Sequence, residues 1–78
     1  MAVITLYAKA GCHLCDEARV HLEDLAAERD FELREVDIRG DPELFERYRY
    51  RIPVITLDGA ERLEGQIAWE DVFALLDR

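Results

Sequence analysis

The stretch LYAKAGCHLCDEAR, residues 6–19, decides the fold because it joins the end of an apolar strand to the start of a helix. The strand, Val3–Ala8, is short, apolar and rich in β-branched residues, which is typical of a strand covered on both faces. Beyond it, apolar residues recur at helical spacing over about His13–Glu28. The two cysteines of the chain, Cys12 and Cys15, therefore lie where a strand passes into a helix.

The next segments repeat the strand and helix signals. Phe31–Ile38 mixes β-forming residues with charges and predicts a second strand, parallel to the first and joined to it by a right-handed crossover. Asp41 can cap a following helix, with Pro42 at its first position, where a missing N–H costs nothing. The apolar side of this helix is expected to consist of Leu44, Phe45 and Tyr48.

The last third of the chain predicts a hairpin and a closing helix. Pro53 stops any helix, and the strand that follows it, Val54–Leu57, reaches a turn at Asp58-Gly59. A short second strand ends near Glu64. The closing helix spans Ala68–Leu76, and its expected inward-facing residues are Trp69, Val72, Phe73 and Leu76.

The resulting order, βαβαββα, predicts one α/β domain over residues 1–78. Its four-stranded mixed sheet would carry helices on both faces, which is the minimal thioredoxin-like fold.

Charge and hydropathy exclude several classes of protein. Eighteen acidic residues against ten basic ones give a net charge of −8, which argues against a nucleic-acid binder or an anionic-membrane binder. No apolar run approaches the roughly 20 residues that cross a bilayer. We therefore expect a cytoplasmic protein and a monomer, in a compartment where a close cysteine pair is catalytic or metal-binding rather than a structural disulfide.

Helix geometry separates the two cysteines. Cys15 falls on the same side of the predicted helix as Leu22 and Ala26, whereas Cys12 lies at or near the helix N-cap. Free N–H groups and the helix dipole there stabilise a thiolate, so the pKa of Cys12 should be depressed, and Lys9 adds positive charge. Cys12 would attack a substrate disulfide, and Cys15 would resolve the mixed disulfide.

A structural zinc site is the main chemical alternative. Such a site needs four ligands, but the remaining candidates, His13 and His21, lie on the same predicted helix as Cys15 and cannot close a tetrahedron. No metal site is therefore expected.

The motifs LYAKAGCHLCDEAR, FELREVDI and RIPVITLDG, followed by the closing helix, resemble glutaredoxins over essentially the whole chain. The Cys-His-Leu-Cys-Asp motif is similar to that of the small bacterial glutaredoxin-like proteins. The resemblance implies that Cys12 is the nucleophile and Cys15 the resolving thiol. It also implies that Pro53 is a cis-proline facing the cysteines, that the backbone of Ile52 pairs with a bound peptide or glutathione, and that Lys9 lies near the glutathione carboxylate.

Two segments depart from the glutaredoxin pattern. His13-Leu14 stands where glutaredoxins have Pro-Tyr, and Glu64–Ile67 stands where they have two glycines and then an acidic pair that holds the glutamyl end of glutathione. We therefore expect no bound cofactor, with glutathione only a candidate co-substrate. The expected partners are a disulfide-bearing protein or a low-molecular-weight thiol, and a reductase or dithiol donor.

Three alternatives to a dithiol oxidoreductase remain open. The chain could be a redoxin that donates electrons to a reductase enzyme, or it could carry an iron–sulfur cluster together with glutathione. A non-catalytic binding module with the same fold is a third alternative.

Three further candidates each have a functional and a structural interpretation. His13 could tune Cys12, or it could simply pair with Glu17 one helical turn away. The segment RYRYR, Arg47–Arg51, could place Arg51 at the rim of the site to attract an anionic substrate, or it could be a helix end with favourable cations. Trp69 is expected to belong to the core.

Overall fold

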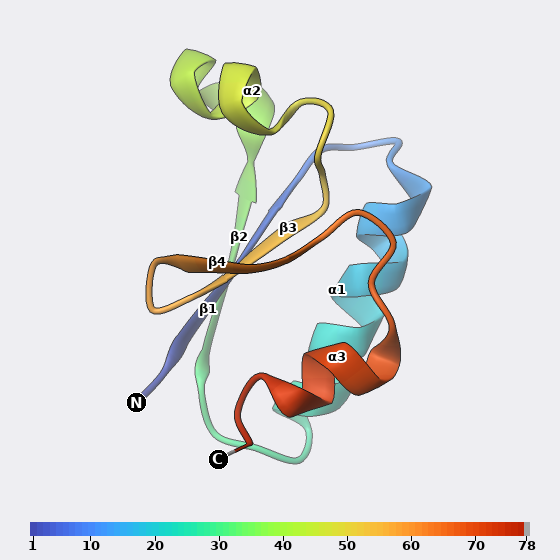
Figure 1. The fold of residues 1–78 in the computed structure, drawn as a ribbon, viewed down its shortest axis with the longest axis vertical. Coiled ribbons are helices and arrows are strands. Elements are labelled where there is room, and N and C mark those ends of the chain that lie inside the picture. The colour runs from blue at the N-terminus through green and yellow to red at the C-terminus, as the bar shows by residue number, and fades with distance from the viewer. Residues whose placement is uncertain (78) are drawn as a thin grey trace.

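A computed structural model describes residues 1–77, and its centre is a four-stranded sheet in the order β2-β1-β3-β4 (Figure 1). β1 is parallel to β2 and antiparallel to β3, and β3 forms a hairpin with β4. The elements in chain order are β1 Val3–Ala8, α1 His13–Ala26, β2 Glu32–Asp37, the 3-10 turn η1 Ile38–Gly40, α2 Pro42–Tyr48, β3 Val54–Leu57, β4 Ala60–Glu64 and α3 Trp69–Ala74.

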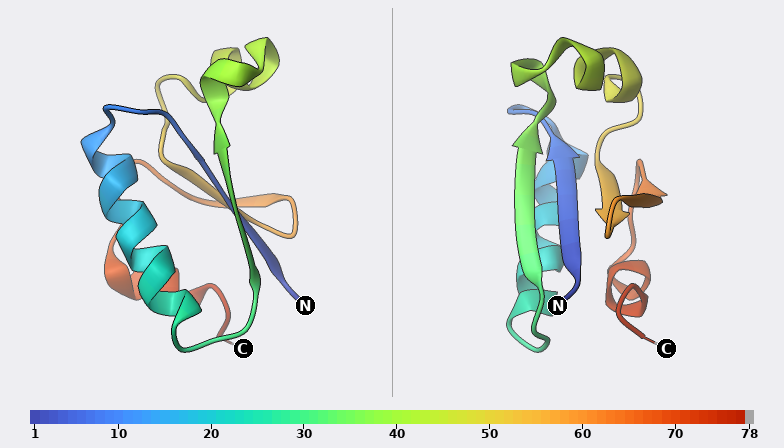
Figure 2. Two further views of the ribbon diagram at one scale, coloured as in Figure 1. Left: turned by 180° about the vertical axis from the view of Figure 1, so that it is seen from behind. Right: turned by 90° about the vertical axis from the view of Figure 1, so that its left-hand side faces the viewer.

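The larger core lies between the sheet and the two helices α1 and α3, which cover the same face (Figure 2). Because strand side chains alternate, Ile4, Leu6 and Ala8 of β1 all point to this face and are at most 1% exposed. From α1 they meet a stripe at helical spacing that consists of Cys15, Ala18, Leu22 and Leu25, each 0% exposed.

A second, smaller core lies on the opposite face, where α2 covers one end of the sheet. Ile38, Tyr48 and Val54 are buried there, with Tyr7 of β1 packed against them. The rings of Tyr7 and Tyr48 are 4.9 Å apart between centroids. Asp41 fixes the start of α2 because its carboxylate accepts hydrogen bonds from the backbone N–H groups of Glu43 and Leu44, at 2.9 and 3.3 Å.

The β3–β4 turn has the backbone that its sequence predicts. Asp58 and Gly59 both have positive φ, 50° and 88°, as a two-residue type I′ hairpin requires. The Asp58 carboxylate also accepts a hydrogen bond from the N–H of Val3, at 2.9 Å, so the turn is held against the start of β1.

The expected element order is confirmed, but several details differ. α1 ends at Ala26, two residues before the predicted Glu28, and Ala26 itself is exposed. The prediction that Trp69 faces inward is wrong: Trp69 is 47% exposed and stacks on Phe73, while the unpredicted Leu75 is buried. The expected helix, Ala68–Leu76, has nine residues, whereas α3 has only six. The inward-facing positions were therefore assigned wrongly at the start of the helix. Arg78, the last residue of the predicted domain, lies outside the described residues.

Within residues 1–77, no helix has both the length and the apolar character that a bilayer crossing requires.

The contrast between the two sides of α1 gives a stability prediction. Leu22→Ala should lower the free energy of unfolding by about 2–5 kcal/mol, because it leaves a cavity between α1 and β1. Val20→Ala, on the exposed side of the same helix at 53% exposure, should change it by less than about 0.5 kcal/mol. Urea unfolding of both oxidised variants measures the difference, and equal losses would contradict the assigned packing.

Candidate active site

The candidate site lies at one end of the sheet, where strand register brings three segments into line. Tyr7 pairs with Val54, so Pro53 comes level with Ala8, the last residue of β1. Val54 pairs with Glu64, so Gly65 comes beside Pro53. The loop that carries Cys12 leaves β1 at this same end and enters α1 (Figure 1).

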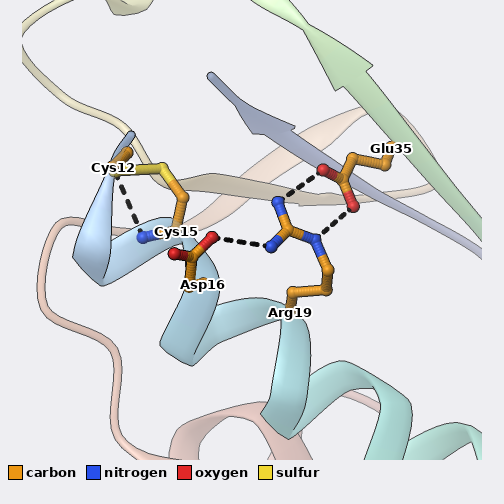
Figure 3. Close-up of a disulfide and its surroundings, with 5 residues drawn as sticks. All are labelled: Cys12, Cys15, Asp16, Arg19 and Glu35. Carbon is orange, nitrogen blue, oxygen red and sulfur yellow. Dashed lines mark hydrogen bonds and ion pairs between the residues drawn. A yellow bond between two sulfur atoms is a disulfide. The ribbon is translucent and has the colours of Figure 1, made fainter. Parts of the chain in front are cut away.

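Cys12 and Cys15 form a disulfide across the first turn of α1 (Figure 3). Their Cα atoms are 5.2 Å apart. Cys12 is the N-cap of α1, and its Sγ accepts a hydrogen bond from the backbone N–H of Cys15 at 3.2 Å. Cys15 is 0% exposed, whereas Cys12 is half-buried. The separation predicted from helix geometry is therefore present, and a thiolate at Cys12 would be met by the N–H groups of the helix end.

An ion-pair chain beside the disulfide links α1 to β2 (Figure 3). The Arg19 guanidinium donates to Asp16 at 2.8 Å and, through two nitrogens, to Glu35 at 2.6 and 2.7 Å. Hydrogen bonds from Arg19 to Glu35 and Asp16 raise the pKa of Arg19 above its ordinary value. The carboxylate next to the cysteine pair is thus compensated by a cation. Sequence analysis did not single out Arg19, although its spacing from Asp16 is that of a helical ion pair.

The segment before β3 is held in place by backbone hydrogen bonds. The Ile52–Pro53 peptide bond is cis, as the glutaredoxin resemblance implies. The N–H of Gly65 donates to the carbonyl groups of both Arg51 and Pro53, at 3.2 and 2.9 Å. The N–H of Ile52 donates to the carbonyl of Tyr48 at 3.0 Å, while no backbone N–H within residues 1–77 donates to the carbonyl of Ile52. Of the two backbone groups of Ile52, the carbonyl is therefore the one without a backbone partner among the described residues.

Arg51 makes contacts within the chain that sequence analysis did not anticipate. Its guanidinium donates to Glu64 at 2.7 Å and to Glu61 at 2.5 Å, and it lies 5.3 Å from the ring centroid of Tyr48. The hydroxyl of Tyr48 donates to Glu61 at 2.9 Å. Arg51, and then Tyr48, hold the pKa of Glu61 below its ordinary value. These contacts tie the segment before Pro53 to β4, and attraction of an anionic substrate by Arg51 stays a prediction.

Lys9 and His13 lie on either side of Cys12 in the sequence. Within residues 1–77, no carboxylate lies within ion-pair distance of Lys9, so its charge is available to a ligand. His13 has an 85% exposed side chain, and its Nε2 lies 2.9 Å from the Glu17 carboxylate. The predicted pairing of His13 with Glu17 is present, and its tuning of Cys12 stays a prediction.

The described part of the chain, residues 1–77, contains no group of three or more His, Cys, Asp or Glu side chains that could hold a metal ion.

Comparison with known proteins agrees with this geometry. Residues 3–77 match the family described as glutaredoxin-like domain (DUF836). The chain belongs to this family. Uncharacterized proteins of Mycobacterium tuberculosis and Mycobacterium bovis are 32% identical to this glutaredoxin-like domain over 63 residues, or 74% of the chain. The match spans 65% of those relatives' own length.

Solved structures extend the likeness to the fold. Protein XcR50 from X. campestris is 33% identical, with a TM-score of 0.75 over 95% of each chain. Protein Ne2328 from Nitrosomonas europaea is 28% identical, with a TM-score of 0.80 over 97% of this chain and 92% of that one. A mutant thioredoxin from Halobacterium salinarum is 22% identical, with a TM-score of 0.75 over 97% of this chain and 72% of its own. The glutaredoxin-like domain therefore has the thioredoxin-like α/β fold predicted from its sequence.

The unequal burial of Cys12 and Cys15 predicts unequal reactivity of their thiols. In the reduced protein, Cys12 should be alkylated by iodoacetamide faster than Cys15, with an apparent pKa below the ordinary free-thiol value of about 8.5. The rates are measured across a pH series, with each modified cysteine identified by mass spectrometry. Cys12→Ser and Cys15→Ser isolate each thiol as controls, and equal rates for both thiols would contradict the geometry.

Proposed function

We propose that this glutaredoxin-like domain is a thiol–disulfide oxidoreductase, with Cys12 as the nucleophile and Cys15 as the resolving thiol. The observation that carries the proposal is the asymmetry of the pair: Cys12, a half-buried residue at the N-cap of α1, is bonded to Cys15, which is 0% exposed. A partner can reach Cys12, whereas Cys15 can reach only Cys12. This division of roles is the one that exchange through a mixed disulfide requires.

The reaction starts from the dithiol form. The Cys12 thiolate attacks one sulfur of a substrate disulfide, the substrate S–S bond breaks, and the second substrate sulfur leaves as a thiolate that takes a proton from water. Cys15 then loses its proton and attacks Sγ of Cys12, and the first substrate sulfur leaves as a thiolate and is protonated. Two electrons pass to the substrate, and the chain is left with the Cys12–Cys15 disulfide. A reductase or dithiol donor returns it to the dithiol form.

Substrate backbone would be held at Ile52. Its carbonyl can accept a hydrogen bond from an extended substrate, while its N–H is already bonded to Tyr48. Lys9 would hold a carboxylate of the substrate, because its charge is not used within the described residues. The substrate is a disulfide-bearing protein or a small disulfide, and the compartment is the cytoplasm, where a reduced thiol pair persists.

Removing each thiol in turn tests the assigned roles. Cys12→Ser should abolish reduction of hydroxyethyl disulfide, since the remaining thiol is buried. Cys15→Ser should retain attack on the disulfide and accumulate a mixed disulfide, because the resolving step is lost. Mass spectrometry of the products measures both. A Cys12→Ser variant that forms the mixed disulfide as fast as Cys15→Ser would overturn the assignment.

The electron donor is predicted to be something other than glutathione. Glu64–Ile67 has one glycine, Gly65, and no acidic pair after it, where glutaredoxins have two glycines and then an acidic pair that holds the glutamyl end of glutathione. The net charge of −8 gives no long-range attraction for an anion. Loss of one or two charge-assisted hydrogen bonds, each about 1.5–3 kcal/mol, weakens binding by one to several powers of ten.

A coupled assay distinguishes the donors. Glutathione with glutathione reductase should support disulfide reduction at least about tenfold less well than a thioredoxin-reductase-type donor. Cys12→Ser in both arms gives the background rate. Efficient turnover in the glutathione arm would refute the prediction.

A further inference from the structure

The segment Arg47–Arg51 contains cations that the candidate site does not use. Most arginines in residues 1–77 form ion pairs within the chain, at positions Arg19, Arg29, Arg34, Arg39 and Arg51. Within the same described residues, Arg47 and Arg49 lie within ion-pair distance of no carboxylate, although Glu43 and Glu46 precede them on α2. In an acidic protein, this leaves a local surface with exposed positive charge.

Aromatic rings hold these cations in place. The guanidinium carbon of Arg49 lies 4.8 Å from the ring centroid of Phe45 and 4.8 Å from that of Tyr50, so it is flanked by two rings. Arg47 lies 5.8 Å from the ring centroid of Tyr48. Tyr50 itself is 87% exposed. Stacking limits the motion of the guanidinium groups, and arginine and tyrosine are enriched at protein interfaces.

This surface and Cys12 belong to segments that meet at one end of the sheet. α2 and the start of α1 lie at the same end of the sheet (Figure 2). Two residues of backbone separate Arg49 from Ile52, and Ile52 packs against the same core cluster as Cys12. A polypeptide partner whose disulfide reaches Cys12 can therefore extend along this end of the sheet toward Arg47, Arg49 and Tyr50.

We propose that Arg47, Arg49 and Tyr50 form a docking patch for an acidic segment of the protein whose disulfide reacts with Cys12. A carboxylate can take two parallel hydrogen bonds from a guanidinium, which fixes its orientation. The rest of the molecule repels an acidic segment because the net charge is −8, so this patch sets the direction of approach. At physiological ionic strength charges interact over about 8 Å, so the guanidinium groups act on an approaching carboxylate more strongly than charges on the far side of the molecule do. The small size of the patch disfavours nucleic acid, whose backbone needs an extended basic surface.

The docking proposal rests on the proposed function, which supplies the nature of the partner. The experiment is designed so that failure of one can be told from failure of the other. Two synthetic peptides carry the same disulfide, one flanked by aspartate and glutamate and the other by lysine. Hydroxyethyl disulfide, which is uncharged, reports the chemistry without docking. The reduced wild-type chain should react with the acidic peptide about tenfold faster than with the lysine peptide at low salt, and added salt should reduce this preference.

Arginine variants locate the patch. The double variant R47Q/R49Q should lower the rate with the acidic peptide several-fold and leave hydroxyethyl disulfide unchanged. R62Q removes one positive charge on β4, away from α2, and should change neither rate; R49Q, which also removes one charge, is the variant compared with it. R49K keeps the charge but not the planar donor pair, so a partial loss would assign part of the effect to stacking and geometry. Equal rates with the two peptides, or an unchanged rate in R47Q/R49Q, would overturn the docking proposal.

If no variant reduces any disulfide, the proposed function is refuted. A binding measurement then tests the docking patch by itself. The acidic peptide with serine in place of cysteine carries a fluorescent label, and its anisotropy is followed with the oxidised chain. Binding that is lost in R47Q/R49Q but kept in R62Q supports the patch. Absence of binding, or tighter binding of a labelled single-stranded oligonucleotide through the same arginines, would overturn it.

Discussion

The burial of one side of α1 against the central strand β1 fixes the positions of both sulfur atoms. Ile4, Leu6 and Ala8 meet the helix stripe that begins at Cys15, so the rotation of the helix about its axis is set by apolar packing along its whole length. That rotation buries the sulfur of Cys15. It also leaves Cys12, three residues earlier and outside the first turn, half-buried at the helix end. The difference in burial between two identical side chains is thus a consequence of core packing elsewhere in the helix.

Local compensation of charge is the second constraint on the site. The chain has a large acidic excess, and carboxylates occur close to the site, at Asp16, Glu61 and Glu64. Each of them is met by an arginine: Asp16 by Arg19, and the other two by Arg51. The same contacts tie α1 to β2 and the segment before Pro53 to β4. Electrostatic neutralisation and mechanical support of the site therefore come from the same side chains.

Features of the fold and the site that depend on residues close together in the sequence could be predicted from it. The N-cap role of Cys12, the cap at Asp41 and the Asp58-Gly59 turn each depend on residues within a few positions of one another. Contacts between distant segments could not be predicted in this way. The pairing of Arg19 with Glu35 depends on strand register, and the engagement of the Ile52 N–H by Tyr48 depends on how α2 ends. Trp69 was misplaced because apolar character at helical spacing does not reveal where a short helix starts to pack.

The outer strands of the sheet bear on how the molecule meets other polypeptides. β2 presents Glu32, Arg34 and Glu35 along one edge, and the β3–β4 pairing is irregular between Ile55 and Thr56 at the other. Charged edges and bulges discourage a foreign strand from extending a sheet. An extended polypeptide is therefore disfavoured as an added strand at either edge of the sheet. The carbonyl of Ile52, in contrast, has no backbone partner among the described residues and lies at the end of the sheet that leads to Cys12, so the proposed exchange reaction would place a substrate strand there and not at a sheet edge.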